Sequence, residues 1–373
     1  MTKSDFIFSL LRSALWQKPL THFNMTPWEY KAVMEDAEKQ CVMGLVTDCL
    51  RSNNMGLKKP CTIHLVKLQN SLSAENKKIN ANLHALCQLM KDNGITNIVV
   101  KGQTIGALYP KPLLRTIGDI DFYIPAKQFQ KAQQLIEKAW NVEAKETKEM
   151  HVSFKYNDTE FEMHRFLREF PNKKMQKAFN ELMDAYPPYP VQVEGQEVPT
   201  LMPTMNVFYT FLHLYHHFIK LGVALRQLCD LTMLLHHHHD NIDKELLTKT
   251  LDDFGFTKAF RAIGTILINK LGLPQEEFPL PINDTDKKYG EKALQLILKH
   301  GNWGRYERSS HDHQSLRYLF ERAWFRMSNQ LLFLRLSPKY NRSLLFDELP
   351  NKTWGRIKSL LSSKTNKHIK TQL

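Results

Sequence analysis

Two aspartates separated by one residue offer the clearest chemistry in this chain. Asp119 and Asp121 flank Ile120 at the start of an apolar stretch that continues to Ile124. If this stretch is a β-strand, its side chains alternate between faces, and both aspartates project from the same one. Two carboxylates held that close repel each other, so one must bind a proton unless a cation neutralises them. The sequence therefore predicts a site for Mg²⁺ or Mn²⁺, since such ions take carboxylate oxygens and substrate phosphates.

A third carboxylate is needed if the site holds two metal ions for phosphoryl or nucleotidyl transfer. Residues 151–156 and 159–164 alternate in polarity around Asn157-Asp158, which predicts a β-hairpin. The alternation places Glu160, Glu162 and His164 on one face. Glu162 is the preferred third ligand because it lies among apolar neighbours, where an unpaired charge is costly. Glu160 is held in reserve.

Lys101 and Gly102 lie where a short buried strand, expected over residues 95–100, turns into a short helix over residues 102–108. Backbone N–H groups at such a helix start can receive a phosphate, and glycine leaves room for its approach. Lys101 and Arg115 could supply positive charge to a triphosphate. The alternative for each is a salt bridge with the carboxylate cluster.

Several of these residues form a pattern that resembles the uncharacterised bacterial nucleotidyltransferase family of the DNA polymerase β-like superfamily. The matching pieces are Lys101-Gly102, Leu108-Tyr109-Pro110, Arg115, Gly118-Asp119-Ile120-Asp121, Glu162-Met163-His164 and the helical segment 225–231. The resemblance implies an α/β (α+β) fold, in which a small mixed sheet flanked by helices binds an NTP through divalent metal. It also implies that Asp119, Asp121 and Glu162 are metal ligands.

The chain departs from that superfamily at the phosphate-facing helix start. The resemblance assigns this role to Gly102, but the usual Gly-Ser pair is replaced by Lys101-Gly102-Gln103-Thr104. The hydroxyl contact to phosphate is therefore absent or falls to Thr104. The acceptor of the nucleotide does not follow from these motifs.

The composition places limits on the partners. The 373 residues carry a formal charge of +13, and residues 301–373 contain 14 Lys and Arg against 5 Asp and Glu. A basic surface of this kind attracts polyanions such as RNA, although many basic proteins have no nucleic-acid partner. No apolar run reaches the roughly 18 residues of a spanning helix, and the five scattered cysteines do not form a disulfide or zinc pattern. We expect a cytoplasmic protein.

The remaining sequence predicts helices around this core. We expect a helical region over residues 1–94, a nucleotidyltransferase core over 95–200 and a C-terminal helical domain with a basic tail over 201–373. Within them, helices are expected over residues 64–90, 126–140, 205–221, 225–237 and 244–270, and a second hairpin over 191–198.

Two clusters outside the core are open to more than one interpretation. His213, His216 and His217 share a helical face, and a pocket or core role is favoured over metal binding because no acid or cysteine accompanies them. Trp324 and Phe325 could stack on single-stranded nucleic acid together with Trp303, Arg305, Arg326 and Trp354. Alternatively, Trp324, Phe325, Leu331, Leu332 and Leu334 form the core of C-terminal helices.

Three hypotheses follow from the sequence. The first is a metal-dependent nucleotidyltransferase that moves NMP from an NTP to an acceptor hydroxyl on RNA, a metabolite or a protein. The second is a nucleotidyltransferase-like protein that binds nucleotide or RNA without catalysis. The third is a structural protein in which Lys101 and Arg115 neutralise the aspartate pair.

Overall fold

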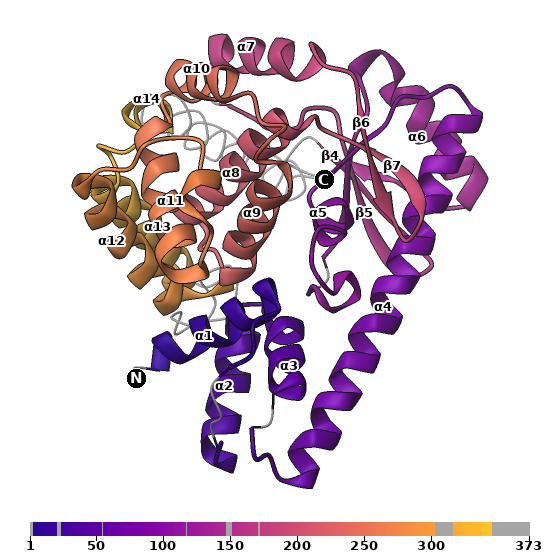
Figure 1. Ribbon diagram of the computed structural model, residues 1–373. Helices are drawn as coiled ribbons and strands as arrows, with labels where there is room; N and C mark the ends of the chain where they lie inside the picture. Colours follow the sequence, from indigo (N-terminus) through magenta and orange to yellow (C-terminus); the bar gives the residue numbers. More distant parts are fainter. Residues whose placement is uncertain are drawn as a thin grey trace, which may run out of the picture.

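A mixed β-sheet lies on one side of the molecule, beside a large helical part (Figure 1). The computed structural model describes residues 3–20, 24–53, 55–116, 118–146, 151–170, 172–302 and 316–344. The elements up to residue 200 are α1 Lys3–Trp16, α2 Pro27–Lys39, α3 Met43–Ser52, α4 Lys59–Asp92, β1 Ile98–Val100, α5 Gly102–Gly106, η1 Pro112–Leu114, β2 Ile120–Tyr123, α6 Ala126–Trp140, β3 Lys145–Glu146, β4 His151–Tyr156, β5 Thr159–His164, α7 Lys173–Asp184, β6 Tyr189–Val193 and β7 Gln196–Thr200. Those that follow are α8 Pro203–Lys220, α9 Leu225–His238, α10 Lys244–Phe254, α11 Thr257–Leu271, η2 Gln275–Glu277, α12 Asp284–His300, α13 Leu316–Leu332 and α14 Pro338–Ser343. The expected α/β class is confirmed.

Helix α4 connects the N-terminal helices to the sheet. It has 34 residues, which corresponds to a length of about 51 Å. Figure 1 shows it running from the level of α2 and α3 to the sheet. Near its C-terminal end, Leu83, Leu86 and Met90 are buried in the same apolar cluster as the sheet. The helix expected over residues 64–90 lies within α4.

The sheet has the strand order β1-β2-β5-β4-β3. Strands β2 and β5 are parallel, whereas the other pairs are antiparallel, so the sheet is mixed. The hairpin of β4 and β5 has the predicted bounds. Its turn residues Asn157 and Asp158 have φ angles of 45° and 59°, which a two-residue hairpin turn requires and which Asn and Asp tolerate better than most residues. This explains how the turn forms without glycine.

The two faces of the sheet differ in polarity. On one face, Phe122, Phe161 and Met163 are fully buried in a cluster that includes Phe129 and Ile136 of α6. On the other face, β1 contributes Ile98 and Val100 to a separate apolar cluster, which is formed mainly by the helices. The polar side chains of β2 and β5 also lie on this second face. The sheet therefore presents charged groups toward the helical half of the molecule.

The second hairpin, β6 and β7, forms its own two-stranded sheet. It encloses the predicted region 191–198, and Gly195 has a φ angle of 79° in its turn. Thr200 ties this hairpin to the main sheet, since its Oγ1 donates a hydrogen bond of 2.7 Å to the Val99 carbonyl oxygen.

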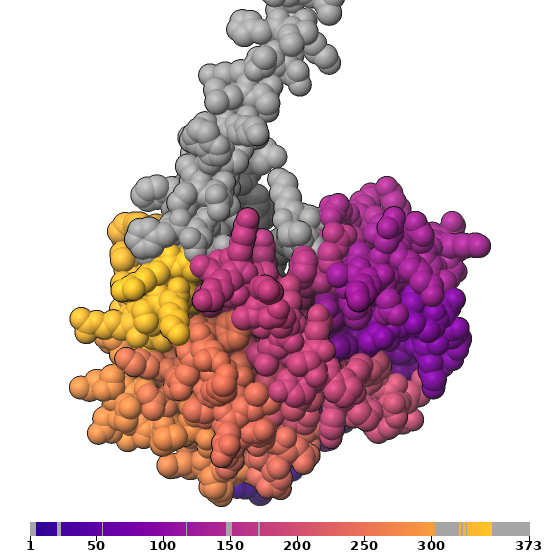
Figure 2. Space-filling model, turned by 90° about the horizontal axis from the view of Figure 1, so that it is seen from above, coloured from indigo at the N-terminus to yellow at the C-terminus, as the bar shows by residue number. Residues whose placement is uncertain are grey.

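The second half of the chain is helical, as expected, but one predicted helix is wrong. The expected helix over residues 244–270 is two helices, α10 and α11. Gly255 ends α10 with a φ angle of 75°, a left-handed conformation that glycine adopts without penalty. In Figure 2, the orange and yellow residues of this half cover one side of the molecule, whereas the purple residues up to the sheet cover the other.

The C-terminal helix α13 does not bury the side chains that the core interpretation requires. Trp324 is 59% exposed, Leu331 is 62% exposed and Leu332 is 43% exposed. The core interpretation is therefore wrong for these three residues. Trp303, Arg305 and Trp354 lie outside the described residues, as does the side chain of Arg326. Among the described helices, none combines the length and the apolar composition needed to cross a bilayer.

Candidate metal and nucleotide site

The parallel pairing of β2 with β5 brings the predicted ligands together. In this register Asp121 lies opposite Glu162, and Tyr123 lies opposite His164. Residues opposite each other on neighbouring strands share a face, and the next residue with the same orientation follows two positions later. Asp121, Glu162 and His164 therefore lie side by side on the face turned toward the helices. Asp121 and Glu162 are about 40 positions apart in the sequence, and the parallel register of the two strands places them opposite each other.

Asp119 lies just before β2, at the exposed edge of this group. The nearby Asp121 charge, together with desolvation, raises the pKa of Asp119 above its ordinary value. Two neighbouring carboxylates repel each other in this way. Of the three predicted acidic residues, the structure places Asp121 and Glu162 in one group with His164, and Asp119 lies two residues before Asp121 in the chain.

His164 joins the carboxylates. Its Nε2 lies 2.9 Å from Asp121 Oδ1 and 3.6 Å from Glu162 Oε2. His151, buried on the neighbouring strand β4, places Nε2 at 3.6 Å from Glu162 Oε1. The sequence put His164 on the correct face but assigned it no role. The Glu-x-His spacing on a strand was the signal that could have identified it as a ligand candidate.

This donor set fits a divalent cation. One potential ligand atom from each of Asp121, Glu162 and His164 lies within 4.8 Å of the other two. Two carboxylates are the ligands that Mg²⁺ and Mn²⁺ prefer, and an imidazole nitrogen adds a donor better suited to transition metals.

Lys101 lies directly against the cluster. Its Nζ is 2.9 Å from Asp121 Oδ2, and the Lys101 side chain is only 16% exposed. Burial alone would raise the pKa of Asp121, but the Lys101 charge and the hydrogen bonds from His164 and Lys101 outweigh it. The pKa of Asp121 therefore lies below its ordinary value, and Asp121 is a carboxylate at neutral pH.

Gly102 and Thr104 belong to the five-residue helix α5, which follows Lys101. Gly102 has a φ angle of 45°, so this turn from strand to helix favours glycine. Thr104 is buried, and its Oγ1 donates a hydrogen bond of 2.8 Å to the Lys101 carbonyl oxygen. The Thr104 hydroxyl thus stabilises the turn, and its contact with phosphate remains a prediction.

Arg115 forms an ion pair that the sequence did not anticipate. Its Nε and Nη2 each donate a hydrogen bond of 2.7 Å to the two carboxylate oxygens of Asp230 on α9. Tyr109 also donates to Asp230, at 2.7 Å. Arg115 is 4% exposed, so this bidentate pair is buried. The phosphate contact predicted for Arg115 would require its guanidinium to leave Asp230.

Arg226 is the arginine that lies beside the loop before Asp119. Its Nη1 donates to the Thr116 carbonyl oxygen at 3.4 Å. It also lies 3.7 Å from the position that a Cβ on Gly118 would occupy. From the sequence, Arg226 and Asp230 are spaced for an intrahelical ion pair that could also help to close the wall of the active site. The structure pairs Asp230 with Arg115 instead and places Arg226 beside the loop.

Two histidine rings on α8, those of His213 and His217, lie next to Lys101. His213 Nδ1 lies 3.4 Å from Lys101 Nζ, and the ring centroid of His213 is 4.3 Å from that of His217. Burial lowers the pKa of His217 to about 3. Burial and the Lys101 charge lower the pKa of His213 well below its ordinary value. Both imidazoles are therefore neutral at pH 7, and His213 can accept a hydrogen bond from the ammonium group.

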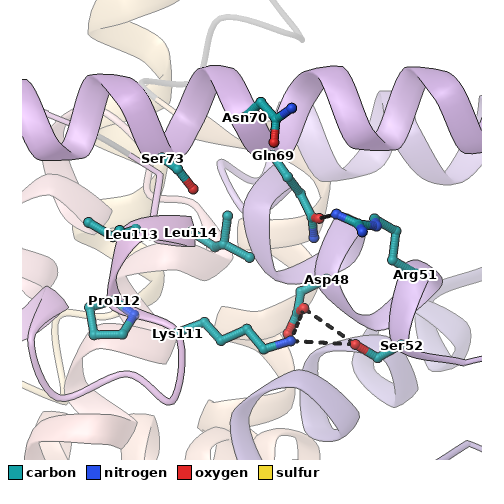
Figure 3. Close-up of a pocket in the computed structure, with 10 residues that line it drawn as sticks. All are labelled: Asp48, Arg51, Ser52, Gln69, Asn70, Ser73, Lys111, Pro112, Leu113 and Leu114. Carbon is teal, nitrogen blue, oxygen red and sulfur yellow. Dashed lines mark hydrogen bonds and ion pairs between the residues drawn. The ribbon is translucent and has the colours of Figure 1, made fainter.

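A separate polar pocket lies between α3, α4 and η1 (Figure 3). It has a volume of about 450 Å³, and Lys111 and Arg51 enter it from different elements. Lys111 pairs with the carboxylate of Asp48, which is 5% exposed. Asn76 of α4 donates hydrogen bonds to the carbonyl oxygens of Leu113 and Arg115. These bonds fix the segment that leads from the pocket to the ion pair of Arg115.

Comparison with known proteins identifies the family of the chain. Acidic residues on adjoining strands of a small mixed sheet are the arrangement that the resemblance implied for a nucleotidyltransferase. A protein family described as uncharacterised nucleotidyltransferase matches residues 28–271, which is more than half of the chain. The chain belongs to this family.

One solved structure is also similar to the chain. It is the crystal structure of an antigenic nucleotidyltransferase-like protein from Paracoccidioides brasiliensis, with 14% sequence identity. The match covers 46% of this chain and 76% of that chain, with a TM-score of 0.30. No curated protein matches the chain.

Proposed function

We propose that this protein is a nucleotidyltransferase, dependent on Mg²⁺ or Mn²⁺, that transfers NMP from an NTP to an acceptor hydroxyl. The observation that supports this most strongly is the register of β2 and β5, which sets Asp121 beside Glu162. Asp119 lies two residues before Asp121 and adds the third carboxylate. Membership of an uncharacterised nucleotidyltransferase family supports the reaction class, and that class requires an NTP.

The charges around the cluster support a metal ion. Asp119, Asp121 and Glu162 provide three carboxylates, and Lys101 is ion-paired with Asp121. The Asp121 charge, together with burial, raises the pKa of Asp119, as expected for neighbouring carboxylates that repel each other. A divalent ion would remove this repulsion. When bound, it would polarise phosphoryl oxygens and neutralise charge that develops on them during transfer.

The residues of the chain then have separate tasks. Asp119, Asp121 and Glu162 hold the metal, and Glu162, at the partly exposed side of the cluster, also receives the proton of the acceptor hydroxyl. The acceptor oxygen forms a bond to the α-phosphorus of the NTP. The bond from that phosphorus to the oxygen bridging to the β-phosphate breaks, and pyrophosphate leaves with the electron pair. Deprotonation by a positioned carboxylate contributes about 10²–10⁴-fold to such a reaction.

The triphosphate needs positive charge and open backbone. Lys101, Gly102 and Thr104 lie at the start of α5, beside the carboxylates, and remain the proposed phosphate contacts. We propose that Arg226 is the arginine that contacts the triphosphate, because it lies beside Gly118. Arg115 keeps its predicted role only if substrate binding opens the bidentate pair with Asp230.

The domain boundaries, the acceptor and the cellular compartment are also part of the proposal. Residues 1–94, 95–200 and 201–373 would form the helical region, the core and the C-terminal domain. The basic residues of the last part favour RNA as acceptor, but a metabolite or a protein hydroxyl would use the same chemistry. The scattered spacing of the cysteines, which gives no disulfide pattern, favours a reducing compartment such as the cytoplasm.

One observation favours the non-catalytic alternative. The Lys101–Asp121 ion pair already neutralises one carboxylate, so a nucleotide- or RNA-binding protein without transferase activity could use this fold. The third hypothesis from the sequence required Arg115 as a second neutralising cation, but Arg115 is paired with Asp230.

Transfer of label separates these functions. Purified protein is incubated with each α-labelled NTP, Mg²⁺ or Mn²⁺ and a cell extract, in parallel with γ-labelled NTP. We expect incorporation from an α-labelled but not from a γ-labelled nucleotide, and its loss in Asp119→Asn. Asp284→Asn, at a carboxylate that is 90% exposed on α12, is the matched control and should transfer normally. Metal-dependent NTP binding without incorporation would instead support the non-catalytic alternative.

A further inference from the structure

Both carboxylate oxygens of Asp121 are already engaged. Oδ1 lies 2.9 Å from His164 Nε2, and Oδ2 lies 2.9 Å from Lys101 Nζ. Chemistry with two metal ions places the ions about 3.5–4 Å apart, and a shared carboxylate needs one oxygen for each. In this chain, one of the two oxygens faces an ammonium group.

The backbone holds Lys101 in this position at an energetic cost. Lys101 has φ and ψ angles of 58° and −144°, a region that is sparsely populated by residues with a Cβ and costs about 1–3 kcal/mol. Strain of this size persists where the surrounding structure fixes it and often marks a functional site. Gly102 follows with a positive φ angle as well, so two successive residues form the tight turn from β1 into α5.

The side chain of Lys101 is held as firmly as its backbone. Its Nζ lies between Asp121 Oδ2 at 2.9 Å and His213 Nδ1 at 3.4 Å. The ammonium group has no acceptor lone pair, so the imidazole nitrogen must accept this hydrogen bond. With its side chain 16% exposed, Lys101 presents its charge at a fixed point inside the site.

We propose that the Lys101 ammonium group takes the place of one of the two catalytic cations, so that the site binds a single divalent ion. The inference rests on the proposed function. The ion would bind on the side of Asp121 that faces Glu162 and His164, where a ligand atom of each residue lies within 4.8 Å of the others. One divalent ion and Lys101 together balance the charges of Asp119, Asp121 and Glu162.

The proposal also gives His213 a function. As the second acceptor for Nζ, it is a positioning residue that keeps the ammonium group directed at Asp121. Lysine acts on phosphate as a point charge, so Lys101 would stabilise the same phosphoryl oxygens that a second ion would otherwise contact. The Lys101-Gly102 pair at this helix start would then place an ammonium group where a second metal ion would otherwise bind.

The number of bound ions tests this directly. Full-length protein without nucleotide is titrated with Mn²⁺, and free Mn²⁺ is measured by electron paramagnetic resonance. We expect one tightly bound ion in the wild type and two in Lys101→Met, in which Asp121 Oδ2 is released. Lys101→Arg, which keeps a positive charge at this place, should retain one ion. Lys111→Met is the matched control at a lysine paired with Asp48, and its stoichiometry should equal that of the wild type.

The outcomes separate this inference from the proposed function. Two ions in the wild type, or one ion in a folded Lys101→Met variant, would contradict the proposal that Lys101 takes the place of a metal ion, even if label transfer is intact. If Lys101→Met does not fold, the numbers of Mn²⁺ ions bound by the wild type and by Lys101→Arg still test the proposal. No bound Mn²⁺ together with no label transfer would overturn the proposed function itself.

Discussion

Two buried ion pairs of this protein have similar composition but different surroundings. Arg115 and Asp230 form two parallel hydrogen bonds of 2.7 Å, and Tyr109 donates a third to the same carboxylate. Lys101 and Asp121 form a single contact of 2.9 Å. The first pair connects the loop before β2 to α9, whereas the second lies within β2 and the turn that follows β1.

The difference lies in the charges around each pair. The pKa of both aspartates lies below its ordinary value, because their partners outweigh the effect of burial. At Asp230, one arginine balances one aspartate. Around Asp121, by contrast, Lys101 pairs with Asp121, the carboxylates of Asp119 and Glu162 lie nearby, and His151 and His164 contact the carboxylates. Excess charge beside a buried pair, rather than burial alone, therefore distinguishes a site that can recruit a ligand from one that stabilises the fold.

The largest expected effect concerns Glu162. Glu162→Gln keeps the size and most hydrogen bonds of the side chain but removes its charge. If Glu162 binds metal and accepts the acceptor proton, label transfer should fall by about 10²–10⁴-fold. Initial rates at saturating NTP measure the loss.

Glu160 provides the matched control for this prediction. It lies two residues earlier on the same strand, is exposed and pairs in register with Lys155. Glu160→Gln should therefore transfer at nearly the wild-type rate. The reverse result, with Glu160 essential and Glu162 dispensable, would move the third ligand to the reserve position.

Arg115→Leu tests the structural pair. Removing one partner leaves the Asp230 carboxylate buried without its arginine, which typically costs about 3–5 kcal/mol. Urea unfolding at pH 7 should show this decrease in the free energy of unfolding. In the double variant with Asp230→Leu, much of the loss should be recovered, because no buried charge remains. A single variant as stable as the wild type would show that the pair contributes little to folding.

A smaller effect is expected from the histidines of α8. Because the folded-state pKa of His217 is about 3, the unfolded chain binds a proton near pH 6.5 that the folded protein does not. The resulting stability is present above pH 6.5 and is lost as the pH falls toward 3, by at most about 1.4 kcal/mol per pH unit.

Urea unfolding at pH 7.5 and pH 5.5 measures this contribution. In His217→Gln, the free energy of unfolding should decrease less between pH 7.5 and pH 5.5 than in the wild type. An equal slope in the wild type and His217→Gln would show that His217 does not cause the pH dependence.

The sequence predicted the local parts of the site well. Alternation predicted that Glu162 and His164 share a face, and the parallel register of β2 and β5 places Asp121 on the same face opposite Glu162, whereas Asp119 lies just before β2. The turn at Asn157 was predicted from its flanking strands although it lacks glycine. These features depend on short-range periodicity, which the order of residues contains directly.

Features that depend on packing between distant elements could not be predicted. Arg115 finds Asp230 at a separation of 115 residues, and only the position of α9 against η1 determines this. For the same reason, the contact of His213 with Lys101 could not be predicted. Residues 244–270 were predicted as one helix because their apolar spacing continues through Gly255, whose left-handed conformation divides it.

The most direct test compares Asp121→Asn with Asp230→Asn in one experiment that measures both label transfer and unfolding. We predict that Asp121→Asn loses transfer and costs less free energy of unfolding than Asp230→Asn, because Asp119 still offsets the Lys101 charge and no longer faces a second aspartate. Asp230→Asn should instead lose several kcal/mol of stability, because Arg115 then lacks its buried counterion. Full transfer by Asp121→Asn would contradict the assignment of the carboxylate cluster as the active site.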